Sequence, residues 1–388
     1  MRCLVLVLSL WAVSHDGVAR GETVTFAVFG DYGSVWPAAT QVADMVHLWN
    51  PDFLVTTGDN NYGDVAIGSI DWELNIGARY GDFMKGRSDG KYPTQTSPVQ
   101  RFFPSVGNHD TDGGFVLGGS PPPAPAATLV PKLQLALVPK LQLGNELPAP
   151  SIPCGAVGTG GGTSDKPGYI DYFHTDPADA AGRLPQGVHT PRHSYYDFRR
   201  GPVHLFALDS DRAQSEPASL VEQQEWLQAR LADSDAPWKF VYFHHPAYSS
   251  GPHGPHPLMQ WPFAQWGADA VFQGHDHNYE RVRVDNIPYF VSGLGGLSPY
   301  GFPRETPGSE FRYSQNNGVM RVIADESNAY FEFIALDPSG DPSGLTIDTF
   351  AMAHPVPEPA VPAIFVCGVF LIAAWLISRG GAETLRGG

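Results

Sequence analysis

Five short segments of the chain carry side chains of the kinds that bind metal ions, and each follows a short apolar stretch. In chain order they are Gly30-Asp31-Tyr32-Gly33, Gly58-Asp59-Asn60-Asn61-Tyr62, Gly107-Asn108-His109-Asp110, His244-His245-Pro246 and Gly274-His275-Asp276-His277. Carboxylate, imidazole, amide and phenolate groups together suit hard or borderline cations such as Fe, Mn and Zn. Because one carboxylate can bridge two ions about 3.5–4 Å apart, the set indicates the two-cation arrangement used for displacement at phosphorus.

Each segment taken alone also has an ordinary structural explanation. An Asp after a strand is commonly a turn or N-cap residue, Tyr62 fits a half-buried packing ring, and His244 before a proline fits a core histidine. His275 and His277 are more specific, since both rings can point to one side of an extended segment. Five such segments in order, each after its own strand, favour a shared metal site over chance assembly.

The apolar stretches predict the elements that must position these side chains. Strands are predicted at 23–29, 52–57, 102–106, 203–208, 239–243 and 270–273, and again at 288–292, 319–324 and 330–336. Helical spacing predicts helices at 37–49 and 220–231, with a shorter one at 258–266. Strands alternate with helices and then cluster, so the fold class predicted is α/β (α+β), a four-layer αββα sandwich of two mixed β-sheets flanked by helices. Polar groups beyond the carboxyl ends of such strands can converge, although about 250 positions separate the first from the last.

The five segments in this order resemble those of the calcineurin-like metallophosphoesterases, and within them the purple (tartrate-resistant) acid phosphatases. The resemblance covers roughly 23–116 and 167–336. Tyr62 is its specific element, because most of the broader superfamily lacks a tyrosine ligand at that position. The chain is similar to the smaller, single-domain form, without the extra N-terminal β domain of the plant enzymes.

The resemblance implies a dinuclear metal centre and assigns each ligand to one of its two cations. The ferric ion would be bound by Asp31, Tyr62 and His277. The second cation, which would be Fe(II), Zn or Mn, would be bound by Asn108, His244 and His275. Asp59 would bridge the two ions. A tyrosine phenolate on Fe(III) gives this family its purple colour.

The resemblance also implies residues that act on the substrate. His109 would contact the substrate phosphate and assist the leaving group. His253, nine residues after the histidine of the fourth segment, matches a second substrate-contacting histidine, and His256 competes with it for that role. His245 and Asp110 are expected to support the ligands or the fold.

The function expected is that of a hydrolase acting on phosphoric ester bonds, with phosphomonoesters as substrates. A metal ion lowers the pKa of bound water, so a metal-bound hydroxide is available to attack phosphorus in line with the departing alkoxide. The cations neutralise charge on the phosphoryl oxygens, and a protonated His109 can donate to the leaving oxygen. Two alternatives stay open: a phosphodiesterase or nucleotidase on the same scaffold, and a catalytically silent protein associated with the envelope or with exopolysaccharide.

Composition narrows the class of partner. Hydrophobic residues make up 42% and aromatic residues 12% of the 388 positions, enough to bury a sizeable core. The formal net charge of −16 opposes binding to a phosphate backbone, so the expected partners are small phosphorylated substrates and not nucleic acid. Three cysteines cannot build a disulfide framework.

Both ends of the chain have the composition of targeting segments. Residues 1–19 combine Arg2, an apolar run and a small-residue site, which predicts a secretory signal peptide. Residues 356–388 resemble the bacterial PEP-CTERM sorting signal, with Val356-Pro357-Glu358-Pro359, a predicted transmembrane segment at 360–378 and then Arg379. That resemblance implies export to the cell envelope or extracellular surface of a Gram-negative bacterium, with a processing enzyme of the exosortase type as partner. The alternative is a plain membrane anchor.

Between these ends, the sequence predicts one metallophosphoesterase domain at 23–336, followed by a Pro/Ser/Gly-rich linker at 337–359. A low-complexity insertion is predicted at about 117–167, where eight residues from Leu129 recur in tandem from Leu137 before a Gly-rich stretch.

Overall fold

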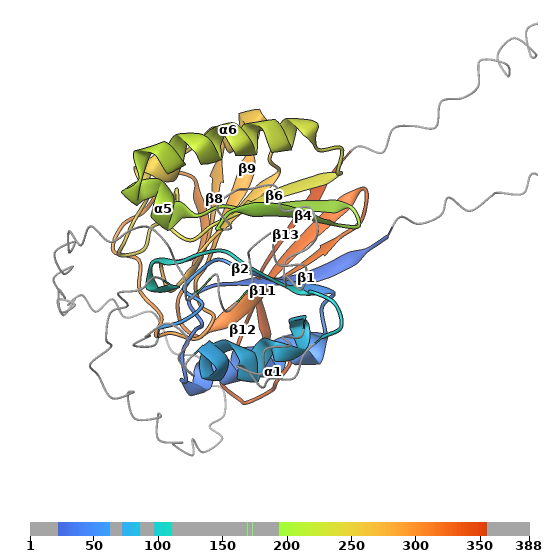
Figure 1. Ribbon diagram of the computed structural model, residues 1–388. Coiled ribbons are helices and arrows are strands. Elements are labelled where there is room, and N and C mark those ends of the chain that lie inside the picture. The colour runs from blue at the N-terminus through green and yellow to red at the C-terminus, as the bar shows by residue number, and fades with distance from the viewer. Residues whose placement is uncertain are drawn as a thin grey trace, which may run out of the picture.

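The computed structural model of the chain describes residues 22–62, 72–85, 97–110, 169, 173 and 194–354. In these residues the chain forms two mixed β-sheets that pack face to face, with helices on the outer side of each (Figure 1). This confirms the predicted fold class. The predictions for 1–19, about 117–167 and 356–388 lie outside the described residues. Among the helices that are described, none combines the length and apolar character that a membrane crossing needs.

The first sheet has six strands in the order β13-β12-β11-β1-β2-β3. They are β1 (Val24–Phe29), β2 (Phe53–Thr56), β3 (Phe102–Pro104), β11 (Gly318–Ala324), β12 (Asn328–Ala335) and β13 (Leu345–Ala353). Strands β1, β2 and β3 are parallel, whereas β11, β12 and β13 continue the sheet in antiparallel pairs. The parallel part therefore brings the carboxyl ends of β1, β2 and β3 to one edge.

The second sheet has seven strands in the order β10-β8-β9-β7-β6-β5-β4. They are β4 (Tyr196–Arg200), β5 (Val203–Ala207), β6 (Trp238–Tyr242), β7 (Ala270–Gln273), β8 (Tyr279–Val284), β9 (Ile287–Ser292) and β10 (Ser309–Tyr313). Its centre, β5-β6-β7-β9, is parallel, and β4, β8 and β10 pair in antiparallel fashion.

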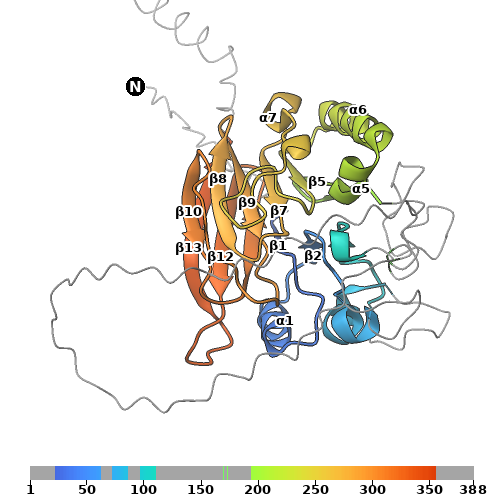
Figure 2. The same cartoon turned by 90° about the vertical axis from the view of Figure 1, so that its left-hand side faces the viewer.

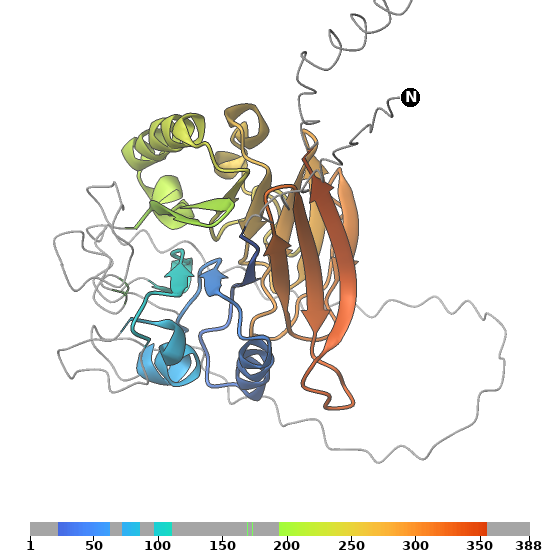
Figure 3. The same ribbon diagram turned by 90° about the vertical axis from the view of Figure 1, so that its right-hand side faces the viewer.

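Helices cover the outer face of each sheet (Figures 2 and 3). Helix α1 (Pro37–Trp49) begins with a proline, buries Val42 and Val46 against the first sheet, and ends at Asn50 in a left-handed conformation. The second sheet is covered by α5 (Ser210–Ser215), α6 (Pro217–Asp233) and α7 (Phe263–Trp266). Shorter helical turns are η1 (Glu73–Gly77), α3 (Ala78–Tyr80), η2 (Gly81–Phe83), η3 (Asn108–Asp110) and η4 (Pro257–Met259).

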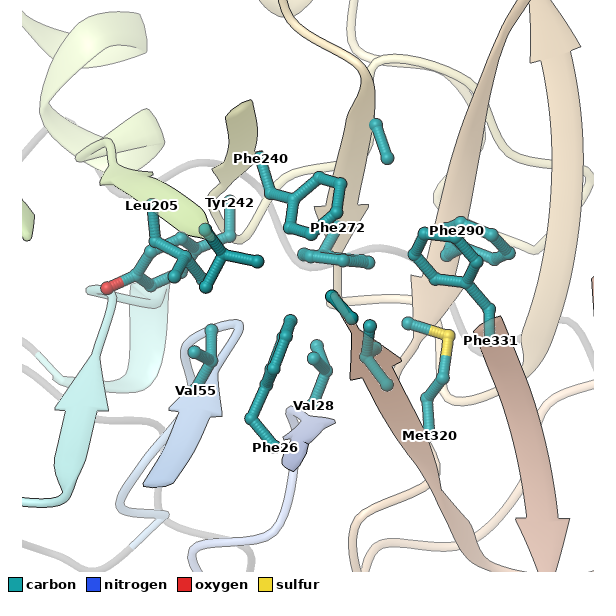
Figure 4. Close-up of a cluster of buried hydrophobic side chains, with 14 of the residues drawn as sticks. Phe26, Val28, Val55, Leu205, Phe240, Tyr242, Phe272, Phe290, Met320 and Phe331 are labelled. Carbon is teal, nitrogen blue, oxygen red and sulfur yellow. The ribbon is translucent and has the colours of Figure 1, made fainter. Parts of the chain in front are cut away.

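The main hydrophobic core lies between the two sheets (Figure 4). Phe26 of the first sheet stacks on Phe53 with ring centroids 4.7 Å apart, and it meets Phe272 of the second sheet at 6.4 Å. Because strand side chains alternate in direction, each sheet places one apolar face here and part of the other face under its helices. Fully burying each aromatic ring stabilises the fold by about 1.5–3 kcal/mol, which holds the strand ends in fixed relative positions.

Two predicted boundaries differ from the structure. Residues 345–353 form β13, so the predicted linker at 337–359 does not extend over them, and the sandwich continues beyond residue 336. The predicted helix at 258–266 is two short turns, η4 and α7, because Pro262 disfavours helical backbone in the residue before it. Strands β4, β8 and β10 were also missed, since each contains charged residues on its more exposed positions.

Candidate metal centre

The five predicted segments meet at one edge of the sandwich, beyond the carboxyl ends of parallel strands from both sheets. They follow β1, β2, β3, β6 and β7. The backbone N–H of His275 donates to Asp31 Oδ2 at 2.9 Å, and Nδ1 of His244 donates to the Thr57 carbonyl at 2.9 Å. These contacts join turns of the two sheets directly, so the sheet packing sets the site geometry.

Three of the candidate ligands have left-handed backbone conformations. They are Asp31 (φ 58°), Asp59 (φ 50°) and His275 (φ 70°). Such backbone costs about 1–3 kcal/mol in a non-glycine residue and is retained where the surroundings impose it. Here it turns each side chain back over the end of its strand. Gly58 (φ 88°) is required beside them, because a Cβ there would lie 2.7 Å from Nδ1 of His244.

Asp31, Tyr62 and His277 form the first group of converging atoms. The Tyr62 hydroxyl lies 3.0 Å from Asp31 Oδ1 and 3.2 Å from His277 Nε2. That Nε2 lies 3.5 Å from Asp31 Oδ1, which closes a triangle. Nδ1 of His277 lies 3.1 Å from the Ser298 carbonyl, which accepts its proton and leaves Nε2 facing the other two atoms with a lone pair.

Asn108, His244 and His275 form the second group. Nε2 of His244 lies 2.9 Å from Asn108 Oδ1 and 3.1 Å from His275 Nδ1. The same nitrogen lies 3.3 Å from Asp59 Oδ1. Since the Thr57 carbonyl accepts the proton on Nδ1, Nε2 is the ring nitrogen that faces these three atoms, and it would present a lone pair to a bound cation.

The donor chemistry of both groups fits metal ions. Carboxylate, amide and imidazole lone pairs converge on a small buried volume, and they repel one another unless a proton or a cation lies among them. Nitrogen and oxygen donors of these types are the ligands of Fe, Zn and Mn in proteins. The residues present therefore fit the dinuclear centre that the sequence predicts.

Asp59 connects the two groups. Its side chain is buried, with Oδ1 toward His244, and its negative charge contributes to the raised pKa of the Tyr62 hydroxyl in the first group. Ligand atoms of Asp31, Asp59 and His244 all lie within 4.8 Å of one another. The backbone N–H of His109 donates to Asp59 Oδ1 at 2.9 Å, which orients the carboxylate. A carboxylate between two ligand groups has the geometry of a bridging ligand.

The groups of the site perturb one another's protonation. Burial alone would raise the pKa of Asp59, but neighbouring imidazoles, His244 first, hold it far below its usual range. Burial would lower the pKa of His244, but the Asp59 carboxylate raises it to about 9. Burial and neighbouring imidazoles lower the pKa of His275, while burial and nearby carboxylates raise that of Tyr62. Opposed shifts within one small volume are typical of functional sites.

A buried network behind the ligands fixes two of the turns. Asp110 Oδ2 accepts hydrogen bonds from Asn60 Nδ2 at 2.7 Å and from the Gly107 backbone at 2.8 Å. Asp110 Oδ1 accepts from the Asn61 backbone at 3.0 Å. The turn after β2 is thus cross-linked to the turn after β3, which is the supporting position expected of Asp110.

The histidines predicted to meet the substrate occupy different places. His109 is partly exposed, with its ring 4.4 Å from that of Tyr62 and Nε2 4.0 Å from Asp59 Oδ2. His253 is exposed, and its ring lies 4.1 Å from that of His275. Both therefore border the ligands on a side that solvent reaches. Nε2 of His256 instead bonds Gln214 of α5 at 2.8 Å, which favours His253 over His256.

Two residues of the site were not singled out from the sequence. The Tyr300 ring stacks on His277 at 4.1 Å and 12°, and its backbone N–H donates to the His277 carbonyl at 2.7 Å. No local pattern marks this tyrosine. Asp276 is fully buried beside the ligands, and its place between His275 and His277 is the signal that could have marked it.

The family model of the calcineurin-like phosphoesterases matches residues 24–279, which include every residue of the two ligand groups. The chain belongs to this family. Among characterised relatives of this phosphoesterase, Fe(3+)-Zn(2+) purple acid phosphatase 12 of Arabidopsis thaliana is 27% identical over 203 residues, covering 49% of this chain and 34% of the relative. A purple acid phosphatase of Glycine max is 34% identical over 113 residues, 26% of this chain and 23% of the relative. The chain therefore matches about a third or less of the length of these relatives.

Two solved structures share the fold of this phosphoesterase. A purple acid phosphatase from yellow lupin (Lupinus luteus) seeds has a TM-score of 0.55 at 18% identity, covering 86% of this chain and 54% of that chain. The anchor protein of the inner membrane complex of Plasmodium has a TM-score of 0.54 at 15% identity, covering 89% and 94%. At these identities the similarity is one of fold.

Proposed function

We propose that this phosphoesterase is a metal-dependent phosphatase that hydrolyses phosphomonoesters at a dinuclear Fe(III)–M(II) centre, M being Fe(II), Zn or Mn. The observation that carries the proposal is the convergence of two three-residue ligand groups with the Asp59 carboxylate between them. The name of the Arabidopsis relative, which specifies Fe(3+) and Zn(2+), supports the same metals here.

Each ligand group would bind one of the two cations. Asp31, Tyr62 and His277 would hold the ferric ion, and Asn108, His244 and His275 would hold the second cation, with Asp59 shared. When bound, the pair of cations would acidify water and neutralise the phosphoryl oxygens. The phenol of Tyr62 would give up its proton to become a ligand, which the raised pKa makes unfavourable without a nearby cation.

Two histidines of the chain would act on the substrate itself. His109 is held by its backbone on Asp59 and by its ring on Tyr62, so its imidazole has a fixed position beside the ligand groups. From there it would donate a proton to the leaving oxygen, a contribution typically worth about 10²–10⁴ in rate. His253, against the ring of His275, would contact the phosphoryl group from the other side.

We further propose that the protein is exported to the cell envelope or extracellular surface. The support is the sequence of the two ends: the signal-peptide pattern at 1–19 and the PEP-CTERM-like pattern at 356–388. An exosortase-type enzyme would then process the C-terminal segment, which would associate with the membrane until that step.

Metal analysis and a substrate panel on the purified full-length protein test the proposed activity. We expect two metal ions per chain including iron, a visible absorption band, and faster hydrolysis of p-nitrophenyl phosphate than of bis-p-nitrophenyl phosphate or nucleotides. His109→Ala should keep both metals and lose most of the rate. Preference for the diester would favour the phosphodiesterase alternative, and a protein with neither metal nor activity would refute the proposal.

A further inference from the structure

Two buried acidic side chains follow the end of β7 without belonging to either ligand group. Asp276 lies between the ligand candidates His275 and His277, and Glu280 follows four residues later at the start of β8. Both are fully buried. Buried acids need hydrogen-bond donors, and the donors here show what these two residues hold in place.

In the part of the chain that the structure describes, the side-chain hydrogen bonds of Asp276 go to the loop at 249–254, which carries His253. The Ser249 hydroxyl donates to Asp276 Oδ2 at 2.5 Å. The backbone N–H of His253 donates to Oδ1 at 3.0 Å, and that of Gly254 donates to Oδ2 at 3.3 Å. Gly251 packs so closely on this carboxyl group that a Cβ there would collide with it.

Glu280 fastens the same loop at a different point. It accepts hydrogen bonds from the Ser250 backbone at 2.6 Å, from the Ser250 hydroxyl at 2.5 Å and from the Ser309 hydroxyl at 2.6 Å. None of these donors belongs to His253. Glu280 therefore supplies a matched control, a buried acid that anchors the loop without bonding the histidine that it carries.

We propose that Asp276 is a positioning residue of the phosphate-binding site, which fixes the His253 backbone relative to the metal ligands on either side of Asp276. The inference rests on the proposed phosphatase function. Asp276 shares a turn with His275, and the His253 ring packs 4.1 Å from the His275 ring. The short path His275–Asp276–His253 thus couples the position of a ligand to that of a substrate-facing imidazole. Charge-assisted hydrogen bonds in a buried site are the strong ones, and they resist displacement by water.

Asp276→Asn keeps the side chain's size but replaces one acceptor oxygen with an N–H donor. In either orientation of the amide that donor would face a backbone N–H, so the hydrogen bond from His253 or the one from Gly254 beside it is lost and the anchoring of this backbone is weakened. Misplacement of a substrate-binding group by about 1 Å can lower the reaction rate on the order of 100-fold. We expect the affinity of the metal-loaded protein for inorganic phosphate to fall about tenfold or more, with metal content unchanged.

A double-mutant cycle on the full-length, metal-loaded protein tests whether Asp276 acts through His253. Calorimetric titration with inorganic phosphate would compare wild type, Asp276→Asn, His253→Ala and the double variant, with metal content measured on each. We expect the double variant to bind phosphate as weakly as His253→Ala alone. Glu280→Gln should lower thermal stability while affecting phosphate affinity less than Asp276→Asn. If Asp276→Asn does not fold, Ser249→Ala should show a smaller loss of phosphate affinity in the same direction.

Three results would overturn the inference: unchanged phosphate affinity in Asp276→Asn and Ser249→Ala, additive losses in the double variant, or loss of metal from Asp276→Asn. The last would mean that Asp276 supports the ligands and not the substrate histidine. Failure of the proposed function has a different signature, because the wild-type protein itself would then bind neither a pair of metals nor phosphate.

Discussion

Removal of the Asp59 carboxylate is the most direct test of a shared metal centre. The side chain is 2% exposed, with Oδ1 3.3 Å from His244 Nε2, and its negative charge contributes to the raised pKa of Tyr62. Its ligand atom lies within 4.8 Å of those of Asp31 in the first group and His244 in the second. Asp59→Ala should therefore weaken the binding of both cations, whereas loss of any other ligand should act mainly on one.

The expected magnitude follows from the number of contacts removed. Replacing a residue that merely orients a metal ligand typically lowers metal affinity about 10–100-fold. Asp59 would contribute a negatively charged ligand to each of the two cations, so its loss should cost at least about 100-fold, or about 2.8 kcal/mol, for each ion. Phosphatase activity, which would require both ions, should fall below detection.

Equilibrium dialysis of the full-length protein against buffers of graded free metal, followed by elemental analysis, measures both occupancies. The matched control is Asp235→Asn, an exposed carboxylate paired with Arg199, which should bind both ions as the wild type does. Retention of both ions at wild-type affinity in Asp59→Ala would refute the bridging assignment. Loss of only one ion would place Asp59 on a single cation and contradict it as well.

Three further predictions address the colour, the acid stability and the core. Tyr62→Phe should abolish the visible band while iron remains, and an unchanged spectrum would remove Tyr62 from the iron site. Burial alone would raise the pKa of Asp197, but His204 at 2.6 Å and Arg230 at 2.7 Å lower it. Because its folded-state pKa lies below the unfolded value of about 3.9, Asp197 stabilises the fold above about pH 4, and that stability is lost as pH falls through the folded pKa. Asp197→Asn should therefore have a lower Tm at neutral pH and a flatter fall of Tm on acidification, and parallel acid branches would contradict this. Phe272→Ala opens a cavity between the sheets, where its ring lies 5.6 Å from Phe240. It should lower the free energy of unfolding by about 3–5 kcal/mol in denaturant titration, and a loss below about 1 kcal/mol would argue against a tightly packed interface.

Most strands and the longer helices were predictable because their signals are local. The apolar run from Thr23 to Phe29 predicts a strand and the glycines after it predict a turn. Strand β1 occupies Val24–Phe29. Strand β13 was missed because it follows a Pro/Ser/Gly-rich stretch and only four of its nine residues are buried or partly buried, three against the core and Asp348 against β8. Its pairing with β12 and the bond of Asp348 to Arg281 on β8 are long-range interactions that no local pattern contains.

Candidate ligands were likewise recognisable by residue type, but their partners were not. Asp276 contacts His253 and Tyr300 contacts His277, each more than about twenty positions away in the chain. No local sequence pattern indicates these contacts. The choice between His253 and His256 also depended on geometry. One ring packs on His275, and the other is engaged by Gln214.

The sequence by itself determined which side chains were available for metal binding and which strand each one follows. Apolar runs and glycine-led turns are patterns of adjacent residues, so they can be recognised without the fold. Only the tertiary structure decided which atoms face one another. Packing of the two sheets brings His275 to within hydrogen-bond distance of Asp31 across 244 positions of chain. The left-handed backbone of Asp31, Asp59 and His275 then turns their side chains inward, and that conformation persists because the surrounding turns impose it.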